Sequence, residues 1–243
     1  MVEVCYRSHS LMLSVKRIRK SFGTRRLLHE ASFNLGAGQR MALVGENGTG
    51  KSTLLKIIAG LEPSDKGIVT IAKGRLVGYL PQETVTDGSE SALQFLRNAT
   101  GIGVLEQEMK ALEPLLDQPE KLSEYEALTE RFERLGGYAF LDRARGILDG
   151  LALDGLDLDR PLQTFSGGEK RKLALAAVLL SGVDLLLLDE PTNNLDLVAL
   201  LWLEAYLVRS GATLLVASHD RTFLDHVVER VLAIDPVKHG VML

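Results

Sequence analysis

A glycine-rich segment constrains this chain more than any other part of its sequence. Its residues are Gly45, Glu46, Asn47, Gly48, Thr49, Gly50, Lys51 and Ser52. Glycines let the backbone turn tightly, so that successive N–H groups point at the phosphate oxygens of a ligand. A lysine at this spacing places a cation on the β- and γ-phosphates, and the serine hydroxyl can ligate Mg²⁺. The segment therefore predicts a site for a nucleoside triphosphate.

The residues on either side of this segment predict the frame that phosphate binding requires. Residues 40–44 are typical of a buried strand, and residues 52–59 are typical of a helix. The helix would present its N-terminus, with the positive end of its dipole, to the bound anion. The alternative is a chance glycine-rich turn, and the order of strand, loop and helix argues against it.

Composition limits the classes of protein to which the chain can belong. Its 243 residues, 46% hydrophobic and 25% charged, suit a soluble globular protein of one large or two small domains. The net charge of −4 provides no general attraction to nucleic acid or membranes, so such contacts would need a local patch. Cys5 is the only cysteine, which excludes a disulfide framework and suits the reducing cytoplasm. Apolar runs are too short to span a bilayer, and residues 1–12 read as a leader without a signal-peptide pattern.

Strand-like and helix-like segments alternate along most of the chain. This order predicts the α/β fold class, with a mostly parallel sheet covered on both faces. Between Ser89 and Leu151 the apolar residues instead recur at helical spacing, which predicts a helical insertion over about residues 84–165 of a single domain, 13–243. The expected strands cover residues 13–17, 31–35, 68–71, 77–80, 185–189, 213–217 and 231–234. The expected helices cover residues 120–134, 138–151, 168–180, 198–208 and 221–228.

Two carboxylates follow the most apolar strand of the sequence. Four leucines over residues 185–188 lead directly into Asp189 and Glu190, which places both at the carboxyl edge of the predicted sheet. We expect Asp189 to hold Mg²⁺, and Glu190 to polarise the water that attacks the γ-phosphate. Acidic residues after a strand can also simply cap a loop, but Lys51 and Ser52 upstream favour the functional interpretation.

A second glycine-containing segment opens another predicted helix. Ser166 resembles an N-cap, and Gly167 and Gly168 expose backbone amides at the positive end of the helix dipole. The simple interpretation is a helix cap. The other interpretation is a second phosphate-binding device, which would act on a nucleotide held by another domain.

These motifs together resemble the ATP-binding cassette (ABC) ATPases from Leu13 onward. Residues 45–52 match the Walker A motif, 185–189 the Walker B motif, 166–169 the signature sequence and 194–196 the D-loop. The resemblance implies a P-loop NTPase core with an antiparallel β edge and an inserted helical subdomain, and ATP and Mg²⁺ as ligands. It further implies that Gln82 of the Q-loop and the switch histidine His219 sense the γ-phosphate, with Gln82 also near the metal. Thr53 would contact nucleotide, and Phe22 would lie against adenine.

Residues 190–196 and 218–225, with residues 135–138 and 201–204, resemble the ABC-F branch more specifically. ABC-F proteins lack membrane domains and typically act on the ribosome, as translation factors or antibiotic-resistance proteins. The resemblance implies a second cassette as partner, closing as a sandwich over ATP, and possible contact with ribosomal RNA. The chain departs from the branch in having one cassette instead of two, with Phe165 and Glu169 replacing the commoner Leu and Gln.

Two other functional classes remain open at this point. The chain could be the ATP-binding subunit of an ABC transporter whose membrane domains are on another chain. It could also be a dimerisation module that binds nucleotide without hydrolysis, although intact Asp189, Glu190 and His219 argue against this.

Overall fold

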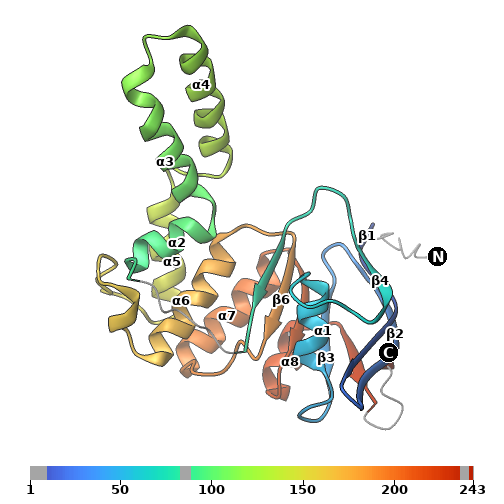
Figure 1. The fold of residues 1–243 in the computed structure, drawn as a ribbon. Coiled ribbons are helices and arrows are strands. Elements are labelled where there is room, and N and C mark those ends of the chain that lie inside the picture. The colour runs from blue at the N-terminus through green and yellow to red at the C-terminus, as the bar shows by residue number, and fades with distance from the viewer. Residues whose placement is uncertain (1–9, 83–88, 236–240, 243) are drawn as a thin grey trace, which may run out of the picture. The chain divides into compact units, whose positions relative to one another are not determined.

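The computed structural model describes residues 10–82, 89–235 and 241–242, and the chain divides into two compact units (Figure 1). The first unit comprises residues 1–82, 183–193 and 204–243, and the second comprises residues 83–182 and 194–203. Residues 1–9 of the predicted leader lie outside the described residues. The mixture of parallel strands and helices is the α/β class that the sequence predicted.

A six-stranded sheet forms the centre of the first unit, in the order β5-β6-β7-β3-β8-β9. The first five strands in this order are parallel, and β9 pairs antiparallel with β8. The leucines at 185–188 in β6 are all buried, as expected of a central parallel strand covered on both faces. The strands are β3 (Arg40–Val44), β5 (Val77–Leu80), β6 (Leu185–Asp189), β7 (Thr213–Ala217), β8 (Arg230–Ile234) and β9 (Val241–Met242).

A separate antiparallel sheet in the same unit has the order β2-β1-β4, from β1 (Leu11–Phe22), β2 (Arg25–Gly36) and β4 (Lys66–Ile71). β1 and β2 are much longer than the two short strands predicted from the sequence. The reason is a β-bulge in each strand: Arg17 of β1 and Glu30 of β2 have left-handed backbones, with φ of 49° and 56°, where the register of the pair shifts. A bulge adds a residue to one strand, so it interrupts the alternating pattern by which strands are recognised.

The core of the first unit joins the two sheets through helix α1 (Lys51–Ile58). One face of β1 contributes Leu13, Val15 and Ile18, which are almost completely buried. Leu54 and Leu55 of α1 are fully buried in the same cluster as Leu187 and Leu215 of the central sheet. Since every large side chain buried here stabilises the fold by about 1.5–3 kcal/mol, the start of α1 is held firmly in place.

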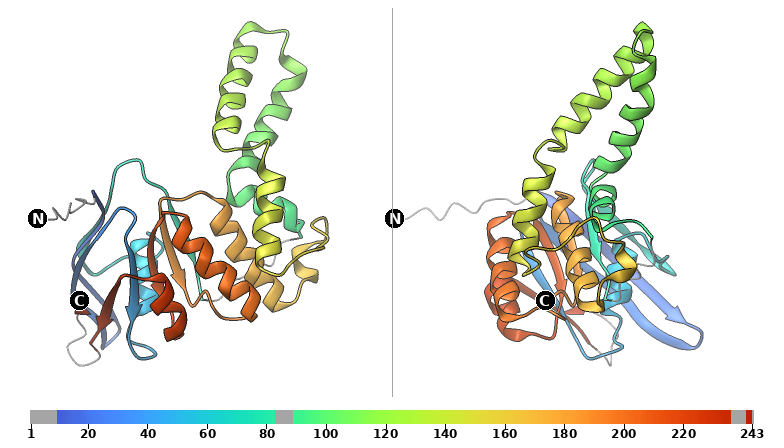
Figure 2. Two further views of the ribbon diagram at one scale, coloured as in Figure 1. Left: turned by 180° about the vertical axis from the view of Figure 1, so that it is seen from behind. Right: turned by 90° about the vertical axis from the view of Figure 1, so that its left-hand side faces the viewer.

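Helices make up the second unit (Figure 2). Helices α3 and α4 pack side by side as a long hairpin, and Phe132 is the one residue of α4 that is buried. No described helix is both long and apolar enough to cross a bilayer. The helices are α2 (Ala92–Ala99), α3 (Ile102–Leu112), α4 (Pro119–Arg134), α5 (Phe140–Gly150) and α6 (Gly167–Leu180). Two further helices are α7 (Leu197–Arg209), which is shared between the units, and α8 (Arg221–Val227) of the first unit.

Candidate nucleotide site

The N-terminus of α1 carries no cap from the protein itself. Gly50 occupies the N-cap position with φ of 103°, so no side chain bonds the first amides, and the first turn contains no acidic residue. A Cβ at Gly50 would lie 2.9 Å from Leu27 Cγ, so glycine is required both for the backbone angle and for the space. The amides of this helix end are therefore available to an external anion.

Lys51 lies at the centre of the loop with its ammonium group enclosed by backbone carbonyls. Its Nζ donates to the carbonyls of Gly45, at 2.7 Å, and Glu46, at 3.1 Å, and lies 3.5 Å from His219 Nε2. Burial lowers the pKa of Lys51, and the charges of Glu190 and Asp189 act in the opposite direction. The cation is thus placed where phosphate oxygens can replace the carbonyls as its partners.

Asp189 and Glu190 stand at the carboxyl end of β6, and both are buried. Glu190 adopts a left-handed backbone, with φ of 51°, while its N–H donates to the Ala217 carbonyl at 2.8 Å. Its carboxylate accepts from the backbone N–H of His219 at 3.2 Å and lies 3.4 Å from His219 Nε2. Such a backbone costs about 1–3 kcal/mol, and residues that adopt it cluster at active sites and ligand clamps.

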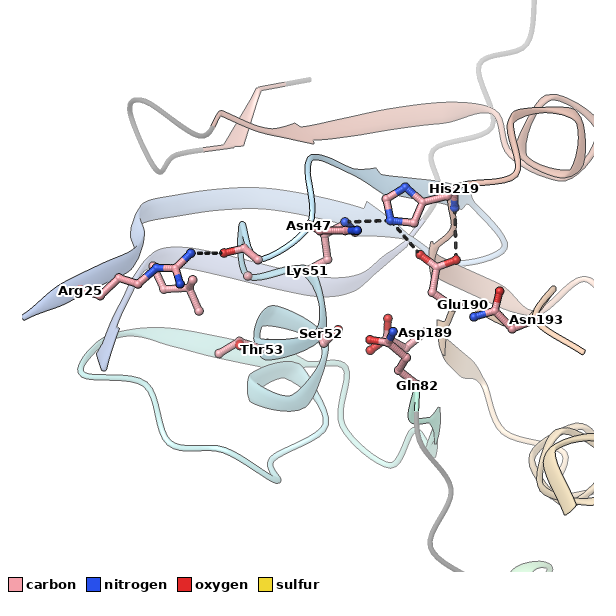
Figure 3. Close-up of a pocket in the computed structure, with 13 residues that line it drawn as sticks. Arg25, Asn47, Lys51, Ser52, Thr53, Gln82, Asp189, Glu190, Asn193 and His219 are labelled. Carbon is pink, nitrogen blue, oxygen red and sulfur yellow. Dashed lines mark hydrogen bonds and ion pairs between the residues drawn. The ribbon is translucent and has the colours of Figure 1, made fainter. Parts of the chain in front are cut away.

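These groups surround one cavity of about 530 Å³ in the first unit, within the usual size range of ligand pockets (Figure 3). Ser52, Gln82 and Asp189 contribute a hydroxyl, an amide and a carboxylate to the same part of the cavity. Oxygen donors of these three kinds are the ligands that Mg²⁺ prefers. The donor set therefore fits the metal that a nucleoside triphosphate carries. The lining residues are Arg25, Leu27, Asn47, Gly48, Gly50, Lys51, Ser52, Thr53, Gln82, Asp189, Glu190, Asn193 and His219.

Three of these lining residues were not predicted from the sequence: Arg25, Leu27 and Asn193. The Nη2 of Arg25 donates to the Gly48 carbonyl at 3.0 Å, which ties the start of β2 to the glycine-rich loop. In the sequence Arg25 lies between Phe22, the predicted adenine contact, and the glycine-rich loop, and this position could have suggested that Arg25 lines the site. Asn193 lies in the segment 190–196 that carries the ABC-F resemblance, and this was its signal. Leu27 offered none, because its place depends on how β2 folds back on α1.

Four predicted nucleotide-binding residues of the first unit do not line the cavity. Gly45 and Glu46 present carbonyls to Lys51, and the buried Thr49 donates through Oγ1 to the Glu46 carbonyl at 2.9 Å. These three residues shape the loop around the cavity. Phe22 ends β1 with 54% of its surface exposed and the Nζ of Lys20 5.0 Å from its ring centre. Contact between Phe22 and adenine stays a prediction.

Ser166, Gly167 and Gly168 belong to the second unit and begin α6. Ser166 forms a capping box: its Oγ accepts from the Glu169 N–H at 3.3 Å, and its own N–H donates to the Glu169 carboxylate at 2.7 Å. These bonds from Ser166 lower the pKa of Glu169. Of the two interpretations that the sequence left open, the structure shows the helix cap, and a role of this helix end in phosphate binding stays a prediction.

The D-loop residue Asp196 joins α6 to α7 within the second unit. Its carboxylate accepts from the Ala199 N–H at 2.9 Å and pairs with Lys172 Nζ at 2.9 Å. The Ala199 N–H and then Lys172 lower the pKa of Asp196. Asp196 therefore caps α7 and fixes the D-loop to the helix that begins with the signature residues.

Comparison with known proteins gives the chain clear relatives. Residues 28–193 match the family model described as ABC transporter. The tylosin resistance ATP-binding protein TlrC of Streptomyces fradiae is 41% identical, over 94% of this chain and 43% of the relative. The energy-dependent translational throttle protein EttA of Mycobacterium tuberculosis is 35% identical, over 91% of this chain and 40% of the relative. The chain spans less than half the length of these relatives.

The fold also matches solved structures. The ATP-binding subunit of an ABC transporter superimposes with a TM-score of 0.73 at 22% identity, covering 96% of this chain and 88% of the other. At this identity the match concerns the fold, and it confirms the predicted ABC ATPase type with its antiparallel sheet.

Proposed function

Since the chain belongs to the ABC transporter family, as an ATP-binding cassette of the ABC-F branch, we propose that it binds and hydrolyses Mg-ATP in the cavity of its first unit. One observation carries this proposal. The buried ammonium of Lys51, an uncapped helix N-terminus and two buried carboxylates all meet at a single cavity. The first two attract phosphate, and the carboxylates serve the metal and the attacking water.

Each residue has a defined part in the proposed reaction. The α1 amides and Lys51 would hold the β- and γ-phosphates, and Ser52, Gln82 and Asp189 would hold Mg²⁺, which neutralises charge on the phosphates. The Glu190 carboxylate would orient the water, since the His219 N–H fixes its position. His219 and Gln82 would sense the γ-phosphate. Thr53, next to Ser52, would contact the phosphate end of the nucleotide.

The proposal includes a second cassette, which would close over the nucleotide. A single glycine-rich loop leaves one side of the γ-phosphate in water, and a second helix N-terminus would supply donors and exclude solvent. In a sandwich of this kind Ser166, Gly167 and Gly168 of one cassette would cover ATP bound to the other. The partner is a second copy or a further cassette.

We place the site of action on the ribosome, in the cytoplasm. This finer step is supported by the relatives, one of which is named as a translational throttle and another as a tylosin resistance protein. The ABC-F pattern in the residues after Glu190 and His219 supports the same assignment. The alternative is a transporter subunit with separate membrane domains, in keeping with the family model described as ABC transporter.

The Glu190→Gln variant tests ATP hydrolysis and ribosome binding together. We expect steady-state turnover to fall by about 10²–10⁴-fold, the usual contribution of a positioned base, while calorimetry shows Mg-ATP binding retained. We expect the variant to cosediment with ribosomes in the presence of ATP. Glu229→Gln, an exposed carboxylate of the same unit paired with Arg40, is the matched control and should change neither quantity.

The two parts of this experiment can fail separately. Retained turnover in Glu190→Gln would remove Glu190 from its role. Binding to membranes that contain a permease, with no binding to ribosomes, would favour the transporter alternative.

A further inference from the structure

Positive charge is concentrated in the first third of the chain. Residues 10–80 contain twelve Lys and Arg but four Asp and Glu, although the whole chain has a net charge of −4. All of these residues belong to the first unit. A strong asymmetry of this kind is typical of a surface that contacts a polyanion.

The bulge in β1 turns two consecutive cations outward. Val15 and Ile18 are buried in the core, and the two residues between them, Lys16 and Arg17, are both exposed. A regular strand would point one of the pair into the protein, but the left-handed backbone of Arg17 adds the residue that brings both to the surface. A left-handed backbone at a residue such as Arg costs roughly 1–3 kcal/mol and persists where the structure enforces it.

Gly67 on β4 admits this bulge. Its φ is 100°, and a Cβ there would lie 2.5 Å from the Arg17 carbonyl oxygen and 2.6 Å from that of Lys16. No other residue can occupy this position without moving β1. The left-handed backbone of Arg17 and the close approach of β1 to Gly67 thus both keep Lys16 and Arg17 exposed.

Further cations join this pair on the outer side of the antiparallel sheet. In the strand register Arg19 faces Lys66, and Ser21 faces Arg26. Arg19, Arg26 and Lys66 also line one depression of about 190 Å³, together with Ser21, Leu28, His29 and Asp65. We call the five residues Lys16, Arg17, Arg19, Arg26 and Lys66 the basic face (β1, β2 and β4 in Figure 1).

Acidic neighbours neutralise only part of the basic face. Glu30 pairs with Arg19, which lowers the pKa of Glu30 and keeps it ionised. Asp65 accepts from the Ser21 N–H at 2.8 Å. The other four members of the basic face have no carboxylate of the described residues within 4.0 Å of their charged nitrogens. A clear excess of positive charge therefore remains on this side of the sheet.

We propose that the basic face binds the sugar–phosphate backbone of a structured RNA. The proposal rests on the proposed function, in which the chain acts on the ribosome, and it names the surface by which the first unit would contact ribosomal RNA. Three of the five residues are arginines, whose planar guanidinium groups match phosphate oxygens in pairs. The strands hold these cations at fixed spacing. Contacts of this kind with the phosphates of the RNA position the protein and do not distinguish between base sequences.

A triple variant, Lys16→Gln with Arg26→Gln and Lys66→Gln, tests the basic face. It leaves Arg17, and so the bulge, unchanged. The control triple variant carries Lys56→Gln, Arg209→Gln and Arg221→Gln, three exposed cations on helices of the same unit, and loses the same charge. Both are made in the Glu190→Gln background. Binding is measured to ribosomes in ATP and to a 20-base-pair RNA duplex over a range of salt concentrations.

We expect the basic-face variant to bind about 10–100-fold more weakly at low salt, with the slope of log K against log salt reduced by about one per lost phosphate contact. The control variant should keep both the affinity at low salt and the slope. Mg-ATP affinity and melting temperature should be unchanged in both, which excludes unfolding as the cause. The single variant Arg26→Gln, at the end of its strand, should lower the slope by about one and serves if the triple variant proves unstable.

The outcomes separate the two proposals. If Glu190→Gln cosediments with ribosomes and both triple variants bind equally well, the basic face is not the RNA surface and the proposed function stands. If Glu190→Gln does not cosediment with ribosomes, the ribosomal part of the proposed function fails, and the RNA duplex still decides the role of the basic face. Binding to vesicles of phosphatidylcholine with phosphatidylglycerol, lost in the basic-face variant, with no RNA binding, would overturn RNA as the partner.

Discussion

The starts of α1 and α6 are the two helix ends that the sequence predicted as phosphate-binding devices, and they are built in opposite ways. Gly50 leaves the first amides of α1 without a side-chain cap, and the first turn of that helix contains no acidic residue. Ser166 and Glu169 cap α6 reciprocally, which places a carboxylate in its first turn. One helix end is thus open to an anion, and the other already holds an anion of its own.

The difference indicates an order of events. An open helix end with Lys51 beside it can bind phosphate as soon as nucleotide arrives, because it loses no existing cap. At α6 an incoming γ-phosphate would meet the charge of Glu169 and would compete with it for the hydroxyl of Ser166. We therefore expect the α1 end to supply most of the binding energy, and the α6 end to determine how readily two cassettes close.

Among the variants that test this comparison of helix ends, the largest effect is expected at Lys51. In Lys51→Ala the affinity for Mg-ATP should fall by about 10–100-fold, since a charge-assisted hydrogen bond contributes about 1.5–3 kcal/mol. Calorimetry measures this loss, and Lys56→Ala, an exposed lysine of the same helix, is the matched control. Unchanged affinity for Mg-ATP in Lys51→Ala would mean that phosphate does not bind at the N-terminus of α1.

A smaller effect, on stability, is expected at Ser166. Ser166→Ala removes the N-cap of α6 and should lower the free energy of unfolding by about 1 kcal/mol. Mg-ATP affinity of the isolated chain should stay the same, because the nucleotide binds at α1. Denaturant unfolding and calorimetry check the two quantities. A loss of affinity with no loss of stability would contradict the assignment of Ser166 to a cap.

Residues that line the cavity could be predicted where a motif fixes particular residue types at fixed spacing. Lys51, Ser52, Asp189, Glu190 and His219 line one cavity, although 168 positions separate Lys51 from His219. Each belongs to a local pattern, a loop before a helix or a carboxylate after a strand, and parallel strands bring such patterns to one edge.

The features that were not predicted depend on tertiary structure, which leaves no local pattern in the sequence. Arg25 lines the cavity because β1 and β2 pair over twelve residues, and the sequence predicted two strands of five. The shorter prediction followed from the bulge, since the exposed pair Lys16 and Arg17 reads as the end of an alternating strand. The sequence predicted Ser166 as an N-cap, but it did not predict the reciprocal bond from the Ser166 N–H to the Glu169 carboxylate.

The third prediction concerns closure of two cassettes. Glu169→Gln keeps a side chain that can accept from the Ser166 N–H, and it removes the negative charge at the start of α6. Within the proposed sandwich we expect nucleotide-dependent dimerisation to strengthen by a few-fold, since a charge at a helix end contributes about 0.3–1 kcal/mol. Sedimentation velocity in the Glu190→Gln background measures the dimer. Glu204→Gln, on α7, is the control. Weaker dimerisation would mean that the Glu169 charge assists closure.

The smallest effect is a change in how stability depends on pH. The Ser166 hydroxyl and N–H lower the pKa of Glu169 below its ordinary value of 4.5, so the folded state favours the carboxylate. The contribution of this cap is therefore complete above pH 4.5 and is lost as the pH falls through the lowered pKa. Glu169→Gln does not titrate, so the unfolding midpoint of the variant should decline less steeply than that of the wild type below pH 4.5. Parallel declines in denaturant unfolding would show that Glu169 is not held by Ser166 in solution, and α6 would then be as open as α1.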